Sequence, residues 1–468
     1  MRSEWRRRDV LRTFAATATA GVPALRRGAA RRRRVGIVGA GMAGVSLAWL
    51  LDGARDVVLL EAAATIGGNI RGVQVDLDGH SFVVDMGAQY FHPGPYPLYT
   101  ALLQEIGLHS GATASAGSHA FPASITVTAD GEPTPRFVSP ILPDRAWPLL
   151  APWNVSGIGA FGAAFPAAKW REIFHESWMV TLEEWLPTLG LSRAQWEGML
   201  LPWAASLFSG SIEQARGLSA RAVMIFAAKA LPPVPWEQVV YYVLDPGMGE
   251  ALRRMLARCS TVEVRTSASV QHVLRQPHGG FEIACGDGQT LEVDDLVLAC
   301  SGPGTRRLLE GLAGTGAQQD SLRGIEFHDA RLALHTDPTY VPPNAFLWSF
   351  LNCHVRGPWC EASMWMGPVL AGPPFATAAK LWKSWTTHRE LPAQVLHEEA
   401  FEHMLPTPAT IRAQAALRML QGRDGLWFAG GYTLPYDSQE TALRSAIGVA
   451  LGLQVTTPRV SALASIPE

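Results

Sequence analysis

Three glycines that follow an early apolar run have the spacing that binds a phosphate-containing cofactor. Residues 35–38 (VGIV) form the run, and the six residues after it are Gly39-Ala40-Gly41-Met42-Ala43-Gly44. A helical pattern (VSLAWLL) comes next, and a second apolar run (57–60, VVLL) ends at Glu61, which lies 22 residues after Gly39. This order and spacing predict a dinucleotide site, because such sites consist of a strand, a GxGxxG turn, a helix, a second strand and an acid.

Each residue type in this segment has a physical reason. Gly39 permits the tight turn, Gly41 lets the backbone approach a pyrophosphate, and Gly44 allows the helix to pack close to the strand. The N–H groups at the start of the helix, around Met42 and Ala43, attract the phosphates. The acid that ends the second run can accept hydrogen bonds from the ribose hydroxyls.

Other catalytic and metal-binding patterns are absent from the sequence. None of the thirteen His belongs to an HExxH motif, and there is no GxSxG. Five cysteines without CxxC spacing predict neither a disulfide framework nor a zinc site; they are Cys259, Cys285, Cys300, Cys353 and Cys360. We therefore expect no metal, and we do not expect a hydrolase with a nucleophile elbow.

The charge of the chain is divided between a basic arm and an acidic body. Residues 1–34 hold eleven Arg against Glu4 and Asp9, a net charge of +9, which leaves −11 for the rest of a chain whose total is −2. An acidic body argues against nucleic acid as a partner, because attraction to phosphates needs a basic face.

The basic arm resembles a bacterial twin-arginine export signal. Arg7-Arg8 form the pair, Leu11 follows, and the weakly apolar stretch 13–25 is too short to span a bilayer. Residues 18–20 and 22–24 both resemble small-residue cleavage sites. We therefore expect export to the periplasm or the medium; the alternative is a basic arm on a cytoplasmic protein.

The residues after Glu61 indicate FAD rather than NAD. The acid followed by Gly67-Gly68 resembles the extension found in the flavin amine oxidase and carotenoid (phytoene) desaturase superfamily of FAD oxidoreductases. That pattern continues with Arg after the glycine pair; here Asn69 stands there, and Arg71 is the substitute.

The resemblance extends along most of the chain and implies further cofactor-binding positions. In 83–91 (VVDMGAQYF) it implies Gly87 and Ala88, whose backbone passes the flavin, and in 262–273 it implies Val270, which holds the adenine. The bacterial branch of amine oxidase-like proteins is the most similar part of the superfamily, on segments 329–338 and 426–452.

The segment 426–452 resembles the terminal FAD motif of the superfamily. Gly430-Gly431 bring the chain close to the cofactor, and Asp437 and Glu440 have capping-box spacing, so a helix begins near Ser438. The start of this helix faces the cofactor, which implies Glu440 and Thr441 as binding residues. Because 401–468 contains no Cys, we predict non-covalent FAD.

The implied fold is α/β, with a Rossmann-type FAD-binding domain (GR2-like) interleaved with a substrate domain made of a mixed sheet and helices. The expected divisions are 1–34 (arm), 35–110, 241–305 and 416–468 (FAD-binding), and 111–240 and 306–415 (substrate). Helical spacing of apolar residues predicts helices within 171–186, 192–208 and 219–231.

The stretch 146–168 has no charged residue but contains several Pro and Gly. A spanning helix there would be poor. We expect a buried, irregular cap segment; the alternative is a lid or a shallow membrane-touching patch that admits an apolar substrate.

Two residues are candidates for direct action beside the flavin. Tyr432 follows the terminal glycine pair, where amine oxidases often have an aromatic residue. Arg331 stands on the strand where relatives that oxidise amines place a Lys; Arg stays protonated and cannot act as a base at neutral pH. His335 and Trp365 are weaker candidates.

Three functions follow from the resemblance. The first is an FAD oxidoreductase that desaturates, isomerises or oxidises an apolar or aromatic small molecule, with oxygen or another electron acceptor. The second is an FAD amine oxidase that gives imine and hydrogen peroxide. The third is a non-catalytic binding protein for prenyl groups or lipids. The missing Lys and the sixteen Trp favour the first.

Overall fold

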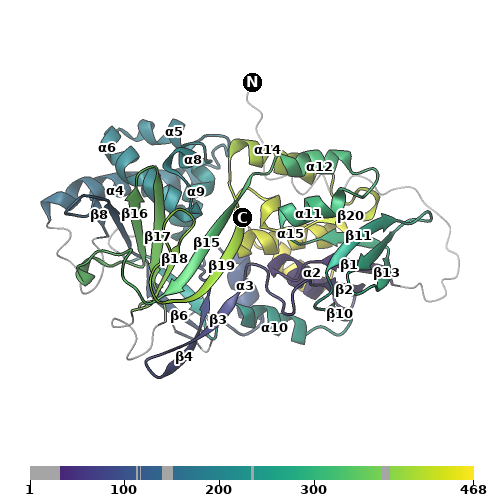
Figure 1. Ribbon diagram of the computed structural model, residues 1–468. Helices are drawn as coiled ribbons and strands as arrows, with labels where there is room; N and C mark the ends of the chain where they lie inside the picture. The colour runs from purple at the N-terminus through teal and green to yellow at the C-terminus, as the bar shows by residue number, and fades with distance from the viewer. Residues whose placement is uncertain are drawn as a thin grey trace.

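The structure is a computed structural model that describes residues 32–111, 114–115, 117–139, 151–232, 237–370 and 380–467. The arm that resembles an export signal lies almost entirely outside the described residues, as does the first part of the uncharged stretch. Figure 1 shows two lobes, with the N-terminal strands in one and most of the helices numbered α4 to α9 in the other.

A parallel five-stranded sheet forms the centre of the first lobe. Its strand order is β10-β2-β1-β14-β20, so segments far apart in the sequence pair side by side. The strands are β1 (Arg34–Val38), β2 (Asp56–Leu60), β10 (Val262–Arg265), β14 (Asp295–Leu298) and β20 (Leu426–Phe428). Near-continuous apolar runs suit strands that are buried on both faces.

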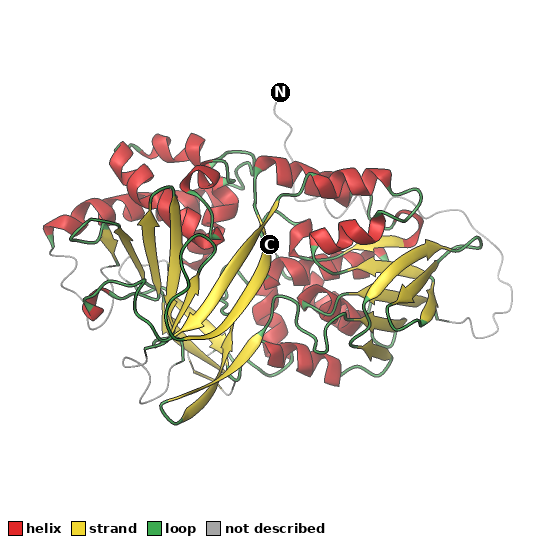
Figure 2. Cartoon of the chain, in the orientation of Figure 1, coloured by secondary structure: helices red, strands yellow, loops and turns green. Residues whose placement is uncertain are grey.

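Helices cover one face of this sheet and a small antiparallel sheet covers the other (Figure 2). On the helical side, a single core joins the buried residues of α2 (Met42–Leu51), α3 (Pro97–Glu105), α10 (Gly249–Ala257), α15 (Gln439–Gly452) and α16 (Pro458–Ala464). The opposite face packs on β11 (Val270–Arg275), β12 (Phe281–Cys285) and β13 (Thr290–Val293).

The second lobe is built on a mixed seven-stranded sheet with the order β19-β15-β18-β17-β16-β7-β8. Its strands are β7 (Ile125–Ala129), β8 (Phe137–Val138), β15 (Phe327–His335), β16 (Leu351–Arg356), β17 (Trp359–Trp365), β18 (Trp382–Trp385) and β19 (Val395–Met404). The long strands β15 and β19 pair antiparallel and run between the lobes (Figure 1).

Helices pack on this sheet through a second apolar core. They are α4 (Val155–Ile173), α5 (Leu182–Trp185), α6 (Arg193–Gln195), a short π-helix (Trp196–Leu200), α7 (Leu201–Phe208), α8 (Ile212–Arg216) and α9 (Ala220–Ala230).

The other regular elements are smaller. The strands are β3 (Gly72–Leu77), β4 (His80–Asp85), β5 (Ala114–Ser115), β6 (Ser118–Pro122) and β9 (Val240–Leu244). The helices are α11 (Gly302–Leu309), α12 (Gly316–Arg323) and α14 (Pro408–Arg418). Short 3-10 turns lie at Pro152–Asn154, Leu186–Leu189, Ala345–Leu347, Arg423–Gly425 and Gly431–Thr433. No helix in the described part of the chain has the length and apolar character needed to cross a membrane.

The uncharged stretch corrects one expectation. The sequence predicts an irregular segment, but residues 155–173 form the regular helix α4, which contains Pro166. Tertiary packing explains why its glycines do not break it: a Cβ on Gly157 would lie 2.8 Å from the carbonyl oxygen of Arg136. A small-residue face therefore brings α4 against β8, and this packing outweighs low helix propensity.

The helix expected over 171–186 is also interrupted. Helix α4 ends at Ile173, and the next helix does not begin until Leu182. His175 has a φ of +50°, in the left-handed region, which ends the helical path.

Candidate active site

The start of α2 is shaped to receive an anion. Gly39 has a φ of +107°, and a Cβ on it would lie 2.7 Å from the backbone nitrogen of Cys300. Helix α2 begins at Met42, and its N-cap residue, Gly41, supplies no side-chain hydrogen bond. The first N–H groups of the helix therefore remain available, as a pyrophosphate requires.

Glu61, at the end of β2, is fixed beside this turn. Its Oε2 accepts a hydrogen bond from the backbone N–H of Ala40 at 2.8 Å, and its Oε1 accepts one from Ala63 at 2.9 Å. Both bonds orient the carboxylate where the first and second strands end side by side. This is the place that the sequence predicts for a ribose acceptor.

A second glycine-containing loop lies next to the first. Gly67 pairs with Gly41 through an isolated parallel β-bridge. Gly68 also approaches Gly41, so closely that a Cβ on Gly68 would be 3.0 Å from the Gly41 Cα. The guanidinium of Arg71 donates to the carbonyl of Gly68 at 2.8 Å and pairs with Glu399 at 2.5 Å. It lies over the ring of Phe401, so β19 holds Arg71 in place.

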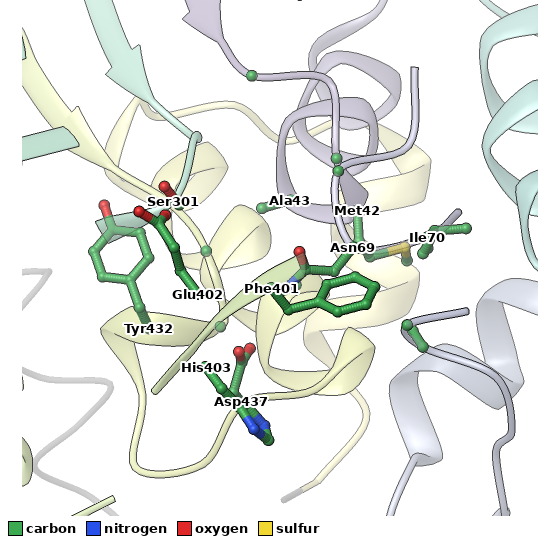
Figure 3. Close-up of a pocket in the computed structure, with 18 of the residues that line it drawn as sticks. Met42, Ala43, Asn69, Ile70, Ser301, Phe401, Glu402, His403, Tyr432 and Asp437 are labelled. Carbon is green, nitrogen blue, oxygen red and sulfur yellow. The ribbon is translucent and has the colours of Figure 1, made fainter. Parts of the chain in front are cut away.

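One cavity of about 880 Å³ connects these elements with the second lobe. Figure 3 shows Met42, Ala43, Asn69 and Ile70 on one side of it, and Ser301, Glu402 and Tyr432 on another. The cavity brings together fourteen of the residues singled out in the sequence: Gly39, Gly41, Met42, Ala43, Glu61, Gly67, Gly68, Arg71, Gly87, Ala88, Val270, Gly430, Gly431 and Tyr432.

Gly44, Glu440 and Thr441 do not line the cavity. Glu440 is fully buried, and its carboxylate accepts hydrogen bonds from the backbone of Leu98 (3.2 Å) and Tyr99 (2.9 Å). Glu440 therefore caps α3 instead of facing a cofactor, and helix α15 begins with a different capping box from the one expected.

The cap of α15 is Ser438, and its partner is Thr441. Each side chain accepts a hydrogen bond from the other residue's backbone N–H, at 3.2 Å and 3.0 Å. The expected first member, Asp437, stands one residue earlier and is left free to face the cavity.

Arg331 lies on β15 as expected, but its side chain points away from the cavity. The side chain is exposed, and its guanidinium donates to the carbonyl of Thr387 at 3.2 Å. The next residue, Leu332, is buried and lines the cavity. Because successive side chains of a strand point to opposite faces, this geometry gives Arg331 no catalytic contact.

Tyr432 lines the cavity and also belongs to the core of the first lobe. Its hydroxyl lies 3.2 Å from Oγ1 of Thr305, and burial raises the pKa of the phenol. A Cβ on Gly430 would lie 2.7 Å from the Tyr432 ring, so a glycine is needed there. His335 and Trp365, the weaker candidates, are buried and do not line the cavity.

The part of the cavity that faces the second lobe is apolar and aromatic. Its lining includes Tyr90, Tyr96, Leu207, Phe208, Val223, Phe226, Leu332, Leu351, Met364 and Trp385. Among the described lining residues, the only cations are Arg71 and Arg307, and both stand on the dinucleotide side. A pocket of this kind suits an apolar substrate.

Polar side chains also line the cavity, and three of them that the sequence does not single out as ligands are Gln89, His403 and Asp437. Gln89 donates to the sulfur of Met364 at 2.8 Å, but its buried Oε1 has no partner among the described residues. The buried Nδ1 of His403 also lacks one there, and burial lowers the pKa of this imidazole to about 4. Burial raises the pKa of Asp437 to about 6. Unpartnered buried polar atoms indicate a ligand that completes them.

These residues fit FAD. The glycine turns clear the path for the backbone of a dinucleotide, the free N–H groups of α2 match its pyrophosphate, and Glu61 matches its ribose. The described residues contain no cluster of His, Cys, Asp and Glu that could hold a metal ion.

Comparison with known proteins agrees with this geometry. Residues 42–330 match the family described as flavin-containing amine oxidoreductase. The chain belongs to this family. It is therefore an FAD-dependent oxidoreductase, as the sequence predicts. A search of curated protein sequences found no match.

Solved structures share the fold of this flavoprotein at low sequence identity. A protoporphyrinogen oxidase candidate from Exiguobacterium sp. 255-15 matches with a TM-score of 0.61 and 15% identity, over 90% of this chain and 98% of the other. A CLA-producing fatty acid isomerase from P. acnes matches with a TM-score of 0.61 and 13% identity, over 90% of this chain and 98% of the other. A double mutant of putrescine oxidase matches with a TM-score of 0.59 and 14% identity, over 91% of this chain and 99% of the other. The expected α/β fold is confirmed.

Proposed function

We propose that this FAD-dependent oxidoreductase acts on an apolar or aromatic small molecule, which it desaturates, isomerises or oxidises at a C–H bond. The observation that supports this best is the aromatic lining of the cavity toward the second lobe, where the described residues place no cation. When bound, FAD supplies the two-electron chemistry, and the protein supplies orientation and a dry environment.

The chain's own residues have distinct tasks in this proposal. Trp385, Phe208 and Leu332 hold the substrate by burying its apolar surface and exclude water from the reacting bond. Gln89 and His403 offer unpartnered polar atoms that can orient a polar group of the substrate. Oxygen or another acceptor would then reoxidise the enzyme.

A second candidate is an amine oxidase that gives imine and hydrogen peroxide. Asp437 supports it, because a carboxylate that lines the cavity and makes no ion pair among the described residues could attract an ammonium group. The non-catalytic alternative is less favoured, because the glycine turns and the free start of α2 preserve the whole dinucleotide site.

Anaerobic mixing of the full chain, loaded with FAD, with two matched compound sets separates these functions. One set contains fatty, isoprenoid and polycyclic compounds, and the other contains amines on the same carbon skeletons. We expect the first set to bleach the visible flavin band. Bleaching by the amines alone would replace the proposal with amine oxidation, and a chain that cannot take up FAD would contradict both.

A further inference from the structure

A lysine that the sequence did not single out lies buried close to the cofactor cavity. Lys383, in β18, has a side chain with no exposed surface. A buried ammonium group is costly unless hydrogen bonds satisfy it. Lys383 does not line the cavity itself.

The partners of Lys383 are two consecutive backbone carbonyls. Its Nζ donates to the carbonyl of Asp85 at 2.6 Å and to that of Met86 at 3.1 Å. The Asp85 carboxylate is engaged elsewhere, since both of its oxygens accept from the backbone N–H of Met248 at 2.9–3.1 Å. Burial lowers the pKa of Lys383, and the charge of Asp85 opposes that shift.

The segment that Lys383 holds is part of the cavity wall, since residues 86–90 all line it. The backbone N–H groups of Met86 and Ala88 donate to the carbonyls of Arg71 (2.7 Å) and Asn69 (3.0 Å). A Cβ on Gly87 would overlap the carbonyl oxygen of Asn69, so the segment lies directly on the cofactor-binding loop. Lys383 fastens the same segment to β18.

Strand β18 connects this segment with the substrate end. Lys383 and Trp385 are two residues apart on one strand, so they share a face of the sheet, and Trp385 lines the cavity. Met364, the cross-strand neighbour of Lys383 in β17, accepts a hydrogen bond from Gln89 of the same segment. Two adjacent strands of the substrate sheet, β17 and β18, therefore both form hydrogen bonds with residues 85–89.

We propose that Lys383 is a positioning residue, which fixes the cofactor-facing segment 86–90 against the substrate sheet through the carbonyls of Asp85 and Met86. Hydrogen bonds from an ammonium group are stronger than those between neutral groups, and both partners are rigid backbone atoms. The proposal goes beyond the choice of substrate, because it depends only on FAD binding to the cavity.

The substitution Lys383→Met tests the proposal, since it keeps the length and apolar stem of the side chain and removes the donor. We expect FAD to bind about tenfold more weakly, because two charge-assisted hydrogen bonds are lost. We also expect the circular dichroism of bound flavin to change, since its surroundings shift. Both are measured by titrating the full-length apoprotein with FAD.

Lys169→Met is the matched control, because Lys169 also donates to two consecutive carbonyls, those of Leu231 (2.9 Å) and Pro232 (3.5 Å), but lies on α4. It should leave the affinity and the flavin signal unchanged. A Lys383→Met protein with wild-type FAD affinity and flavin dichroism would overturn the proposal, even if it unfolds at a lower temperature.

Lys383→Gln keeps the test decisive if the Met variant does not fold. The amide is shorter and reaches one carbonyl at most, so we expect FAD affinity about threefold lower and a changed flavin signal. Wild-type affinity together with a wild-type flavin signal in this variant would show that Lys383 serves the fold alone.

Discussion

Gly44 and Gly39 are in contact across the turn that opens α2: a Cβ on Gly44 would overlap the carbonyl oxygen of Gly39. The contact closes the turn, and it sets the distance between the end of β1 and the first N–H groups of the helix. Gly44 does not line the cavity. Its role in cofactor binding is therefore to let the turn form.

The substitution Gly44→Ala should disrupt this turn. The methyl group meets backbone rather than a movable side chain, so we expect the free energy of unfolding to fall by about 1–3 kcal/mol, and FAD affinity to fall with it. Urea unfolding and FAD titration measure the two effects. Gly448→Ala in α15 is the control: open space surrounds this helical glycine, and the change should stabilise the protein by about 0.5–1 kcal/mol.

Alanine substitutions at the adjacent positions Arg331 and Leu332 should have different effects. Arg331→Ala should leave the rate of flavin reduction within about twofold of wild type, because an exposed side chain outside the cavity has been removed. Leu332→Ala should raise KM for an apolar substrate and lower stability by about 2–4 kcal/mol, since it leaves a void in the wall. Stopped-flow reduction checks the kinetics of both variants, and urea unfolding measures the stability of the Leu332 variant. Slow reduction in the Arg331 variant alone would contradict the strand orientation.

Asp437 should make the apoprotein less stable as the pH rises. Burial raises the pKa of this carboxyl from 3.8 to about 6, so the folded protein holds the proton more tightly than the unfolded chain does. The resulting stability is fully present below about pH 4 and is lost as the pH rises through about 6.

Asp437→Asn should remove that loss. Relative to wild type, the variant should gain of the order of 1–3 kcal/mol between about pH 4 and pH 7, as measured by urea unfolding of the apoprotein. Asp329→Asn, at an exposed position of β15, serves as the control and should follow wild type. A constant difference between the Asp437 variant and wild type at every pH would contradict the prediction.

His403 should act as a neutral hydrogen-bonding group. Burial lowers the pKa of the imidazole to about 4, so it carries no charge at neutral pH. His403→Phe keeps a ring that can stack on Phe208 and Trp385 but removes the unpartnered Nδ1. We expect unchanged FAD affinity and a KM about tenfold higher for substrates with a polar group.

The pH dependence of kcat/KM gives an independent check of this role. Since His403 is already uncharged, its replacement should leave the profile unchanged between about pH 5.5 and pH 8. If the variant lost a titration in that range, His403 would be a proton donor or acceptor in the reaction.

The dinucleotide site can be predicted from the sequence without knowledge of the fold. Its turn, helix and acid lie within 39–61, so local backbone geometry brings them together whatever the rest of the chain does. Glu61 reaches the backbone of Ala40 for this reason. The terminal glycines Gly430 and Gly431 also belong to a local pattern, because a short strand, a turn and a helix follow one another there.

Which strand residues face the cavity depends on the tertiary structure. Side chains alternate along a strand, so a shift of one residue separates Leu332 in the wall from Arg331 in solvent, and only the pairing with neighbouring strands fixes that choice. The contacts of Lys383 also cannot be predicted from the sequence, because its partners, Asp85 and Met86, are about 300 residues away. No local pattern records such a contact, since it exists only once two sheets have formed and packed.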